Sequence, residues 1–153
     1  MYKHILVPTD GSALSRKTVH SAILFAREVV ARITALHVLP EPGAAELEAW
    51  LHHDPHYAEH RAKLFQNLGR ACLAYVTDLA ASEGVPCTGK LLAGQEPYRA
   101  IVDIAAAEHC DLIFMASHGA RGDGTDVPGG ETLKVLIHSA VPVLVHKPVA
   151  AHA

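Results

Sequence analysis

Two short loops carry residue types that could bind a phosphorylated ligand. Residues 9–12 read Thr-Asp-Gly-Ser, and residues 117–122 read Ser-His-Gly-Ala-Arg-Gly and lead to two further glycines at 129–130. Glycine lets backbone N–H groups turn toward an anion, and a helix N-terminus adds unpaired donors and the positive end of a dipole. The Asp10 carboxylate suits ribose hydroxyls or a metal ion instead. The alternative is that these glycines only form tight turns.

The sequence favours a binding protein over an enzyme. It contains neither the phosphate-loop pattern GxxxxGK[ST] nor the nucleophile pattern GxSxG. Ser117 and His118 are adjacent, and adjacent side chains on an extended segment point to opposite sides, so they do not form a nucleophile–base pair. We interpret them as polar residues that position the loop.

Four of the twelve histidines cluster at His52, His53, His56 and His60. The last two are four residues apart, which places them on one face of a helix. With a third ligand from the same segment, such as Asp54, this spacing could hold zinc or nickel. The alternative is a solvated segment in which histidine is tolerated.

Length and composition are those of a single globular domain. The chain has 153 residues, of which 50% are hydrophobic and 19% charged, and its formal net charge is −3. We expect one domain over residues 1–148 and a tail over 149–153. Without a Lys/Arg run, binding to nucleic acid or to an anionic membrane is not expected.

The first apolar segment stops at Pro8, too soon for a signal peptide, which predicts a cytoplasmic protein. The three cysteines form no CxxC pair, so neither a disulfide framework nor a zinc ribbon is expected.

Short apolar runs alternate with apolar residues at helical spacing. The runs predict buried strands at residues 5–7, 33–39, 85–92, 112–116 and 141–145. The stripes predict four helices: one after residue 12, one from Asp54-Pro55 to Gly84, one from residue 95 and one from about residue 130. A longer loop is expected after Pro40. The expected inward residues are Val19, Ala22, Ile23, Ala26, Val29 and Val30, then Phe65, Leu68, Cys72, Tyr75, Val76 and Leu79, then Ile101, Ile104 and Ala105, and last Leu133, Leu136, Ile137 and Ala140.

This alternation predicts a three-layer α/β fold. We expect an open parallel five-stranded sheet of strand order 3-2-1-4-5 with helices on both faces. Because crossovers are right-handed, the carboxyl ends of all strands lie at one edge. Ligands of such folds bind at that edge, where the strand order reverses. The loops at 9–12 and 117–122 follow strands one and four and therefore face each other.

Four blocks of the chain resemble the universal stress proteins. They are residues 3–12 (Lys-His-Ile-Leu-Val-Pro-Thr-Asp-Gly-Ser), 36–38 (Leu-His-Val), 117–122 and 141–145 (Val-Pro-Val-Leu-Val). The resemblance covers nearly the whole chain, and the blocks follow in the family's order. It implies a homodimer of α/β domains of the adenine nucleotide alpha hydrolase-like type that acts in stress response. It also implies two subclasses, of which one binds ATP or a related nucleotide and the other does not.

In the ATP-binding subclass, a pair of glycines separated by two residues is followed nine residues later by Gly-Ser or Gly-Thr. Gly119 and Gly122 match the pair. Gly129 and Gly130 stand at the second position, but only six residues intervene, and Gly130 replaces the hydroxyl residue. Thr132 could supply a hydroxyl group from a different direction. This shortened loop is the feature that distinguishes two hypotheses: a family member that binds nucleotide and one that has lost its affinity for nucleotide.

The resemblance carries over two further roles. Asp10 matches the acidic residue that contacts ribose or metal, and Val38 matches the position whose backbone contacts adenine. Asp123 and Asp126 would repel a triphosphate unless Mg²⁺ intervenes, and Arg121 offsets one of them. The expected ligand is ATP or AMP with Mg²⁺, with slow ATP hydrolysis at most. The candidate cofactor-binding residues are Pro8, Thr9, Asp10, Val38, Met115, Ser117, Gly119, Arg121, Gly122, Gly129, Gly130, Glu131 and Thr132.

The apolar segment 141–145 is an edge strand in the expected order, and an exposed apolar edge favours aggregation. Two such edges that pair across a twofold axis would cover each other, and the resemblance implies the same contact. The alternative is that Lys147 and Pro148 protect the edge of a monomer. Three functions remain open: a nucleotide-binding stress-response regulator, a dimeric module that acts through protein partners, and a His-rich metal-binding variant.

Overall fold

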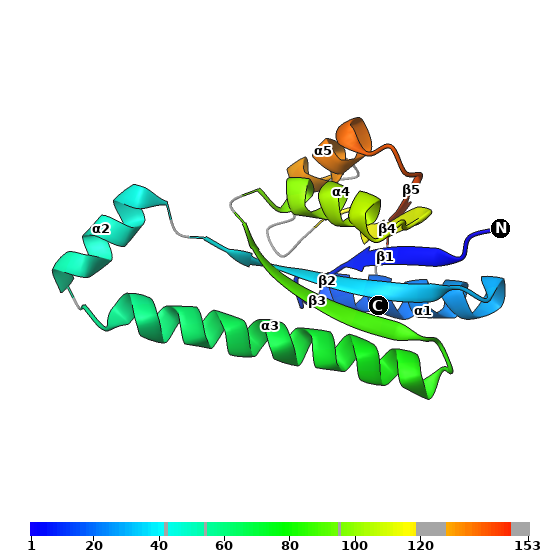
Figure 1. Ribbon diagram of the computed structural model, residues 1–153, viewed down its shortest axis with the longest axis horizontal. Helices are drawn as coiled ribbons and strands as arrows, with labels where there is room; N and C mark the ends of the chain where they lie inside the picture. The colour runs from blue at the N-terminus through cyan, green and yellow to red at the C-terminus, as the bar shows by residue number, and fades with distance from the viewer. Residues whose placement is uncertain (42, 54, 95, 119–127, 148–153) are drawn as a thin grey trace, which may run out of the picture.

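Five parallel strands form one sheet at the centre of the molecule (Figure 1). The structure is a computed structural model that describes residues 1–41, 43–53, 55–94, 96–118 and 128–147. The strand order is β3-β2-β1-β4-β5, and every neighbouring pair is parallel, as predicted. The strands are β1 (His4–Pro8), β2 (Arg32–Pro40), β3 (Cys87–Gly94), β4 (Leu112–Ala116) and β5 (Val143–His146).

Helices cover both faces of the sheet and complete three layers. In Figure 1, α1 and α3 lie on one face, and α4 and α5 lie on the other. The predicted three-layer α/β fold is confirmed. The helices are α1 (Ala13–Val29), α2 (Ala44–His53), α3 (Tyr57–Ser82), α4 (Pro97–Ala107) and α5 (Gly130–His138).

The hydrophobic core is divided by the sheet into two clusters. Ile5 and Val7 of β1 belong to the cluster under α1 and α3, whereas Leu6 between them belongs to the cluster under α4 and α5. Successive side chains of a strand point to opposite faces, so a strand covered on both sides needs an unbroken apolar run. The short run that predicted this strand is therefore buried on both of its faces.

The segment after Pro40 is not the long loop expected from the sequence, because it contains α2. The Trp50 ring of α2 meets the Tyr57 ring of α3 edge-on at 5.3 Å. The Arg61 guanidinium lies 4.3 Å from the centre of the Trp50 ring and 4.4 Å from that of Phe65. These contacts hold α2 against the first turns of α3, and Figure 1 shows the pair reaching beyond the sheet.

Helix α3 begins later than the predicted Asp54-Pro55 start. Its first residue is Tyr57, and His56 takes the N-cap position without a side-chain cap. Asp54 lies outside the described residues, as do Gln95 at the predicted start of the third helix and the expected tail at 149–153. The last strand begins at Val143 rather than at residue 141.

The inward face of α3 is rotated relative to the prediction. Leu68 is 55% exposed and Tyr75 is also exposed, although both were expected inside. The buried residues of α3 are Gly69, Leu73, Val76 and Ala80. Helix α3 has more apolar residues than one face can bury. It approaches the sheet closely at Gly69, where an added Cβ atom would lie 2.7 Å from Cδ1 of Leu91 and 3.0 Å from Cδ2 of His37.

Two other inward predictions are wrong. Leu133, Leu136 and Ile137 of α5 are exposed, and Ala140 is exposed beyond the end of that helix; the buried residues are Thr132 and Val135. Val30 is 79% exposed because α1 ends one residue earlier and Val30 forms its left-handed C-cap. Among the described residues, no helix is long and apolar enough to cross a membrane.

Candidate functional site

The turn after β1 is tied to β2 and to α1 by hydrogen bonds of Thr9. Its N–H donates to the carbonyl oxygen of Leu36 (2.9 Å), and its carbonyl oxygen lies 2.9 Å from Nδ1 of His37. The buried Thr9 hydroxyl lies 2.6 Å from the Ser15 hydroxyl of α1. These bonds fix the backbone of the turn between the ends of two central strands.

The Asp10 carboxylate stands on this turn at the carboxyl edge of the sheet. Its Oδ1 accepts the N–H of Ser12 (2.9 Å), and the Ser12 hydroxyl accepts the N–H of Ser15 and caps α1. Gly11 between them has a φ of +79°, and a side chain there would meet the Cys72 sulfur at 3.4 Å. Both facts favour glycine at this position. Burial raises the pKa of the Cys72 thiol, so this neighbour of the turn is a weak nucleophile.

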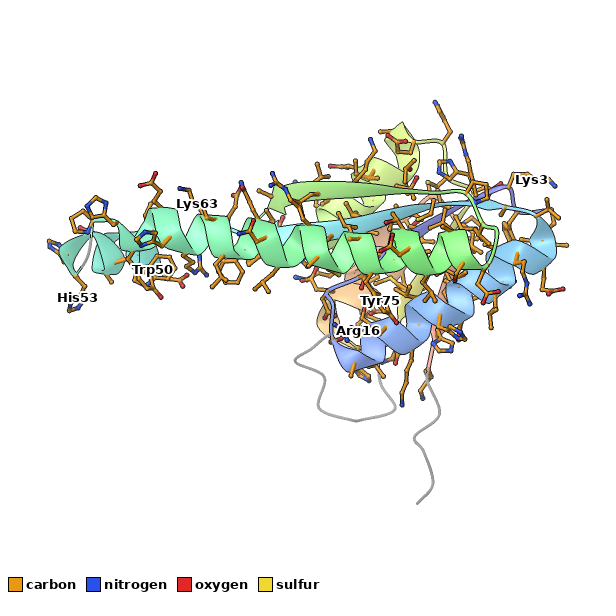
Figure 2. The ribbon with its side chains drawn as sticks, turned by 90° about the horizontal axis from the view of Figure 1, so that it is seen from below. Lys3, Arg16, Trp50, His53, Lys63 and Tyr75 are labelled. Atoms are coloured by element: carbon orange, nitrogen blue, oxygen red, sulfur yellow. The ribbon has the colours of Figure 1, made fainter. Side chains whose placement is uncertain are left out.

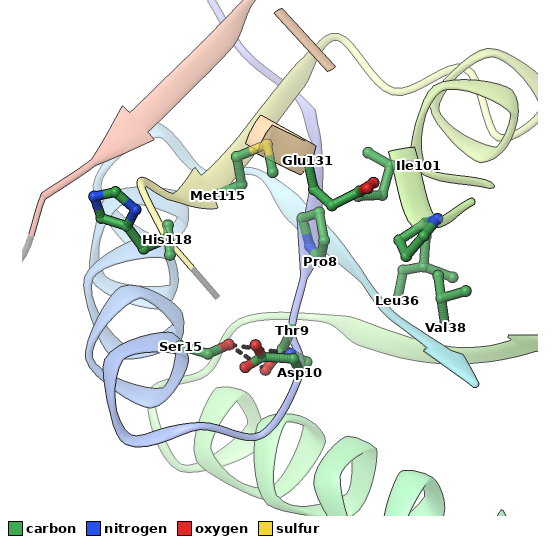
Figure 3. A pocket seen from close by; sticks show the side chains of 12 residues that line it. Pro8, Thr9, Asp10, Ser15, Leu36, Val38, Ile101, Met115, His118 and Glu131 are labelled. Carbon is green, nitrogen blue, oxygen red and sulfur yellow. Dashed lines mark hydrogen bonds between the residues drawn. The ribbon is translucent and has the colours of Figure 1, made fainter. Parts of the chain in front are cut away.

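A cavity of about 200 Å³ opens beside Asp10 at the carboxyl edge of the sheet (Figure 3). Its walls are mostly apolar. They come from β1, β2 and β4, from the turn after β1, and from the starts of α1, α4 and α5. An apolar cleft with a few polar groups is the usual form of a small-molecule site. The lining residues are Pro8, Thr9, Asp10, Ser15, Leu36, Val38, Pro97, Ile101, Met115, Ala116, His118 and Glu131.

The cavity brings together six of the candidate residues. They are Pro8, Thr9, Asp10, Val38, Met115 and Glu131. Four others, Ser117, Gly129, Gly130 and Thr132, are placed near the cavity but do not line it. Gly119, Arg121 and Gly122 lie outside the described residues.

Several lining residues were not predicted, although the sequence carries a signal for two of them. Leu36 is two residues before Val38 on β2, and alternate residues of a strand share a face. Ile101 was expected on the inner face of its helix, one turn after Pro97. His118 lines the cavity and Ser117 does not, although both residues are buried.

The end of β4 is closed against the start of α5 by two hydrogen bonds. The N–H of Gly129 donates to the carbonyl oxygen of Ser117 (2.7 Å), and the Thr132 hydroxyl donates to that of Ala116 (3.0 Å). Thr132 was a candidate hydroxyl donor for a phosphate, but this hydroxyl points back into the fold. At Gly130, a Cβ atom would meet no atom of the other described residues within 4 Å, apart from its chain neighbours and the backbone of its own helix.

Comparisons with known proteins identify the family of this chain. A model of the universal stress protein family matches residues 1–147. The chain belongs to the universal stress protein family. Universal stress protein MJ0531 of Methanocaldococcus jannaschii is 31% identical over 150 residues, which cover 96% of this chain and 83% of that one. Universal stress protein YxiE of Bacillus subtilis is 28% identical over 147 residues, which cover 95% and 99%.

Solved structures of this family share the fold. The structure of hypothetical protein MJ0577 has a TM-score of 0.80 and 27% identity, with 99% of each chain covered. A universal stress protein in complex with cAMP has a TM-score of 0.68 and 20% identity, with 95% and 97% covered. One from Archaeoglobus fulgidus in complex with dAMP has a TM-score of 0.63 and 19% identity, with 94% and 97% covered. At such identities the last two establish the fold alone.

The histidine cluster does not form a metal site in the described part of the chain. No group of three or more His, Cys, Asp or Glu side chains there could hold a metal ion. The His56 and His60 rings lie 6.5 Å apart on α3, while His52 and His53 end α2. No observation favours a metal-binding function at the end of α2 and the start of α3, so we do not propose one.

Proposed function

We propose that this universal stress protein binds an adenine nucleotide, ATP or AMP, in the cavity beside Asp10, and that it acts as a stress-response regulator. The observation that carries the proposal is the apolar cavity at the carboxyl edge, bordered by the Asp10 turn on one side and α5 on the other. Two structural neighbours are complexes with the nucleotides cAMP and dAMP, which supports the same ligand class here.

The lining residues fit the parts of such a ligand. Leu36, Val38, Ile101 and Met115 form apolar walls that suit the faces of a purine base. The Asp10 carboxylate suits ribose hydroxyls as an acceptor, or Mg²⁺ as an oxygen ligand when a polyphosphate is bound. Two expectations from the sequence stay predictions: ATP hydrolysis that is slow at most, and a cytoplasmic location.

Thermal unfolding with and without ligand tests the proposal. We expect adenosine, AMP or ATP, with and without Mg²⁺, to raise Tm in a saturable way. A ligand at about 100 times Kd stabilises by about 2.7 kcal/mol, which is several degrees for a domain of this size. Asp10→Ala is expected to weaken binding at least about tenfold, whereas Asp78→Ala on the exposed side of α3 leaves it unchanged. No shift with any of these ligands at millimolar concentration would refute the proposal and favour a module that acts through protein partners.

We also propose that the protein is a homodimer that pairs through its last strand. Within the described part of the chain, β5 pairs with β4 only, which leaves its other edge open. Leu133, Leu136 and Ile137 of the neighbouring α5 add exposed apolar surface. Sedimentation analysis should give twice the chain mass of 16.3 kDa. Ile137→Asp is expected to favour the monomer, and Leu64→Asp on α3 is the control; a monomeric wild type would contradict the proposal.

A further inference from the structure

The peptide unit between Thr9 and Asp10 is held by hydrogen bonds at both of its polar groups. Its carbonyl oxygen belongs to Thr9 and lies 2.9 Å from Nδ1 of His37 on β2. Its N–H belongs to Asp10 and donates to the Ser15 hydroxyl of α1 (3.3 Å). A peptide unit is planar and its two polar groups point in opposite directions, so the two bonds together fix its orientation. This orientation sets the direction in which the Asp10 side chain leaves the backbone at the wall of the cavity.

The His37 ring is the donor in the bond to Thr9. A carbonyl oxygen can only accept a hydrogen bond, so Nδ1 of His37 carries the proton. His37 lies on β2 between Leu36 and Val38, which line the cavity, whereas His37 itself does not. Alternate residues of a strand share a face, so the ring lies on the opposite face of the sheet, under α3. His37 can therefore act on the cavity only through the backbone of the turn.

Helix α3 confines the His37 ring against this turn. At Gly69 the helix backbone comes so close that an added Cβ atom would lie 3.0 Å from Cδ2 of His37. One turn later, the Cys72 sulfur lies 3.8 Å from the Thr9 hydroxyl oxygen. Figure 3 shows α3 in pale green below the turn that carries Thr9 and Asp10, and Figure 2 shows the same helix lying along the sheet. In such a closely packed place the ring has little room to move away from the Thr9 carbonyl.

We infer that His37 is a positioning residue of the nucleotide site. The inference rests on the function proposed above, because it states what the wall of that site needs in order to bind. The packing of α3 fixes the ring, and the ring fixes the peptide unit from which the Asp10 carboxylate extends. Without the Nδ1 donor this peptide unit can rotate, and the carboxylate takes several directions instead of one. The loss of one hydrogen bond in the bound state corresponds to about fivefold weaker binding.

Calorimetric titration of two variants with AMP and with Mg²⁺-ATP tests the inference. His37→Asn keeps an N–H donor at the δ position but loses most of the ring, whereas His37→Leu fills much of the space and has no donor. We expect His37→Leu to bind about fivefold more weakly than the wild type and His37→Asn to stay within about twofold of it. If His37 only filled space, the order of the two variants would be reversed. His60→Leu makes the same substitution at an exposed position of α3 and should leave Kd unchanged.

Urea unfolding of each variant without ligand shows that the titrated protein is folded, so that a change in Kd is not a change in the folded fraction. If His37→Leu does not fold, His37→Met takes its place, because methionine also has no donor. A donor-free variant that binds as tightly as the wild type would overturn the inference and leave the proposed function standing, as would His37→Asn that binds no better than the donor-free variant. If the wild type binds neither AMP nor Mg²⁺-ATP, the proposed function itself fails.

Discussion

Two leucines of α3 allow one substitution to be compared in two environments. Leu73 is 8% exposed and packs on β3, where its Cβ lies 3.3 Å from the position that a Gly89 side chain would take. Leu68 is five residues earlier and 55% exposed. Leu73→Ala and Leu68→Ala remove the same three carbon atoms from the same helix, so the change in helix propensity cancels in the comparison.

Leu73→Ala should lower the free energy of unfolding far more than Leu68→Ala does. Each carbon removed from a buried side chain loses about 0.8 kcal/mol of transfer free energy, which is about 2.4 kcal/mol for Leu73→Ala. The cavity left between α3 and the sheet adds on the order of 1 kcal/mol, for a total of about 3 kcal/mol. At Leu68 less than half of this transfer free energy is at stake, so we expect a loss of about 1 kcal/mol or less.

Urea unfolding of the two variants and the wild type, at one protein concentration, measures these losses. At this chain length about 3 kcal/mol corresponds to a fall in Tm of about 6–12 °C for Leu73→Ala. Equal losses at the two positions would refute the burial assigned to α3. A larger loss at Leu68 than at Leu73 would restore the helix face that the sequence pattern predicted.

Three further predictions concern single groups. Burial and the nearby Arg32 guanidinium lower the pKa of His4 from 6.5, so the unfolded chain binds more protons than the folded chain below that pH. The free energy of unfolding should therefore fall as the pH drops below about 6.5. In urea unfolding from pH 7 to 5, His4→Gln should make this fall smaller. An unchanged pH slope would contradict the neutral, buried His4. Val30 has a left-handed φ of 57°, so Val30→Gly should raise stability by about 1 kcal/mol and Val29→Gly inside α1 should lower it, as measured by Tm. Burial raises the pKa of Cys110 to about 11, so this thiol should react with a disulfide reagent at pH 8 much more slowly in the folded protein than in urea; equal rates would show that it is exposed.

The sequence predicted the elements whose patterns are set by local geometry. The apolar run around Leu6 has the length and composition that are typical of a strand buried on both faces of a parallel sheet. Helix α2 was missed because it is short and its contacts come from α3, where Arg61 stacks on Trp50. The inward face of α3 was predicted only in part, because Val76 is buried but Leu68 and Tyr75 are exposed. Its apolar residues occupy more than one face, and the close approach of α3 to the sheet at Gly69 cannot be seen in the sequence pattern.

The candidate site could be located from the sequence, but its capacity could not. Parallel strands end at one edge, so Asp10 and Val38 had to approach each other once the strand order was known. How many donors remain for a phosphate depends instead on tertiary hydrogen bonds, such as that from Thr132 to Ala116. A glycine-rich loop therefore indicates where an anion can approach. Which donors remain for that anion depends on the hydrogen bonds that the fold has already formed, and these follow from tertiary packing rather than from the loop sequence.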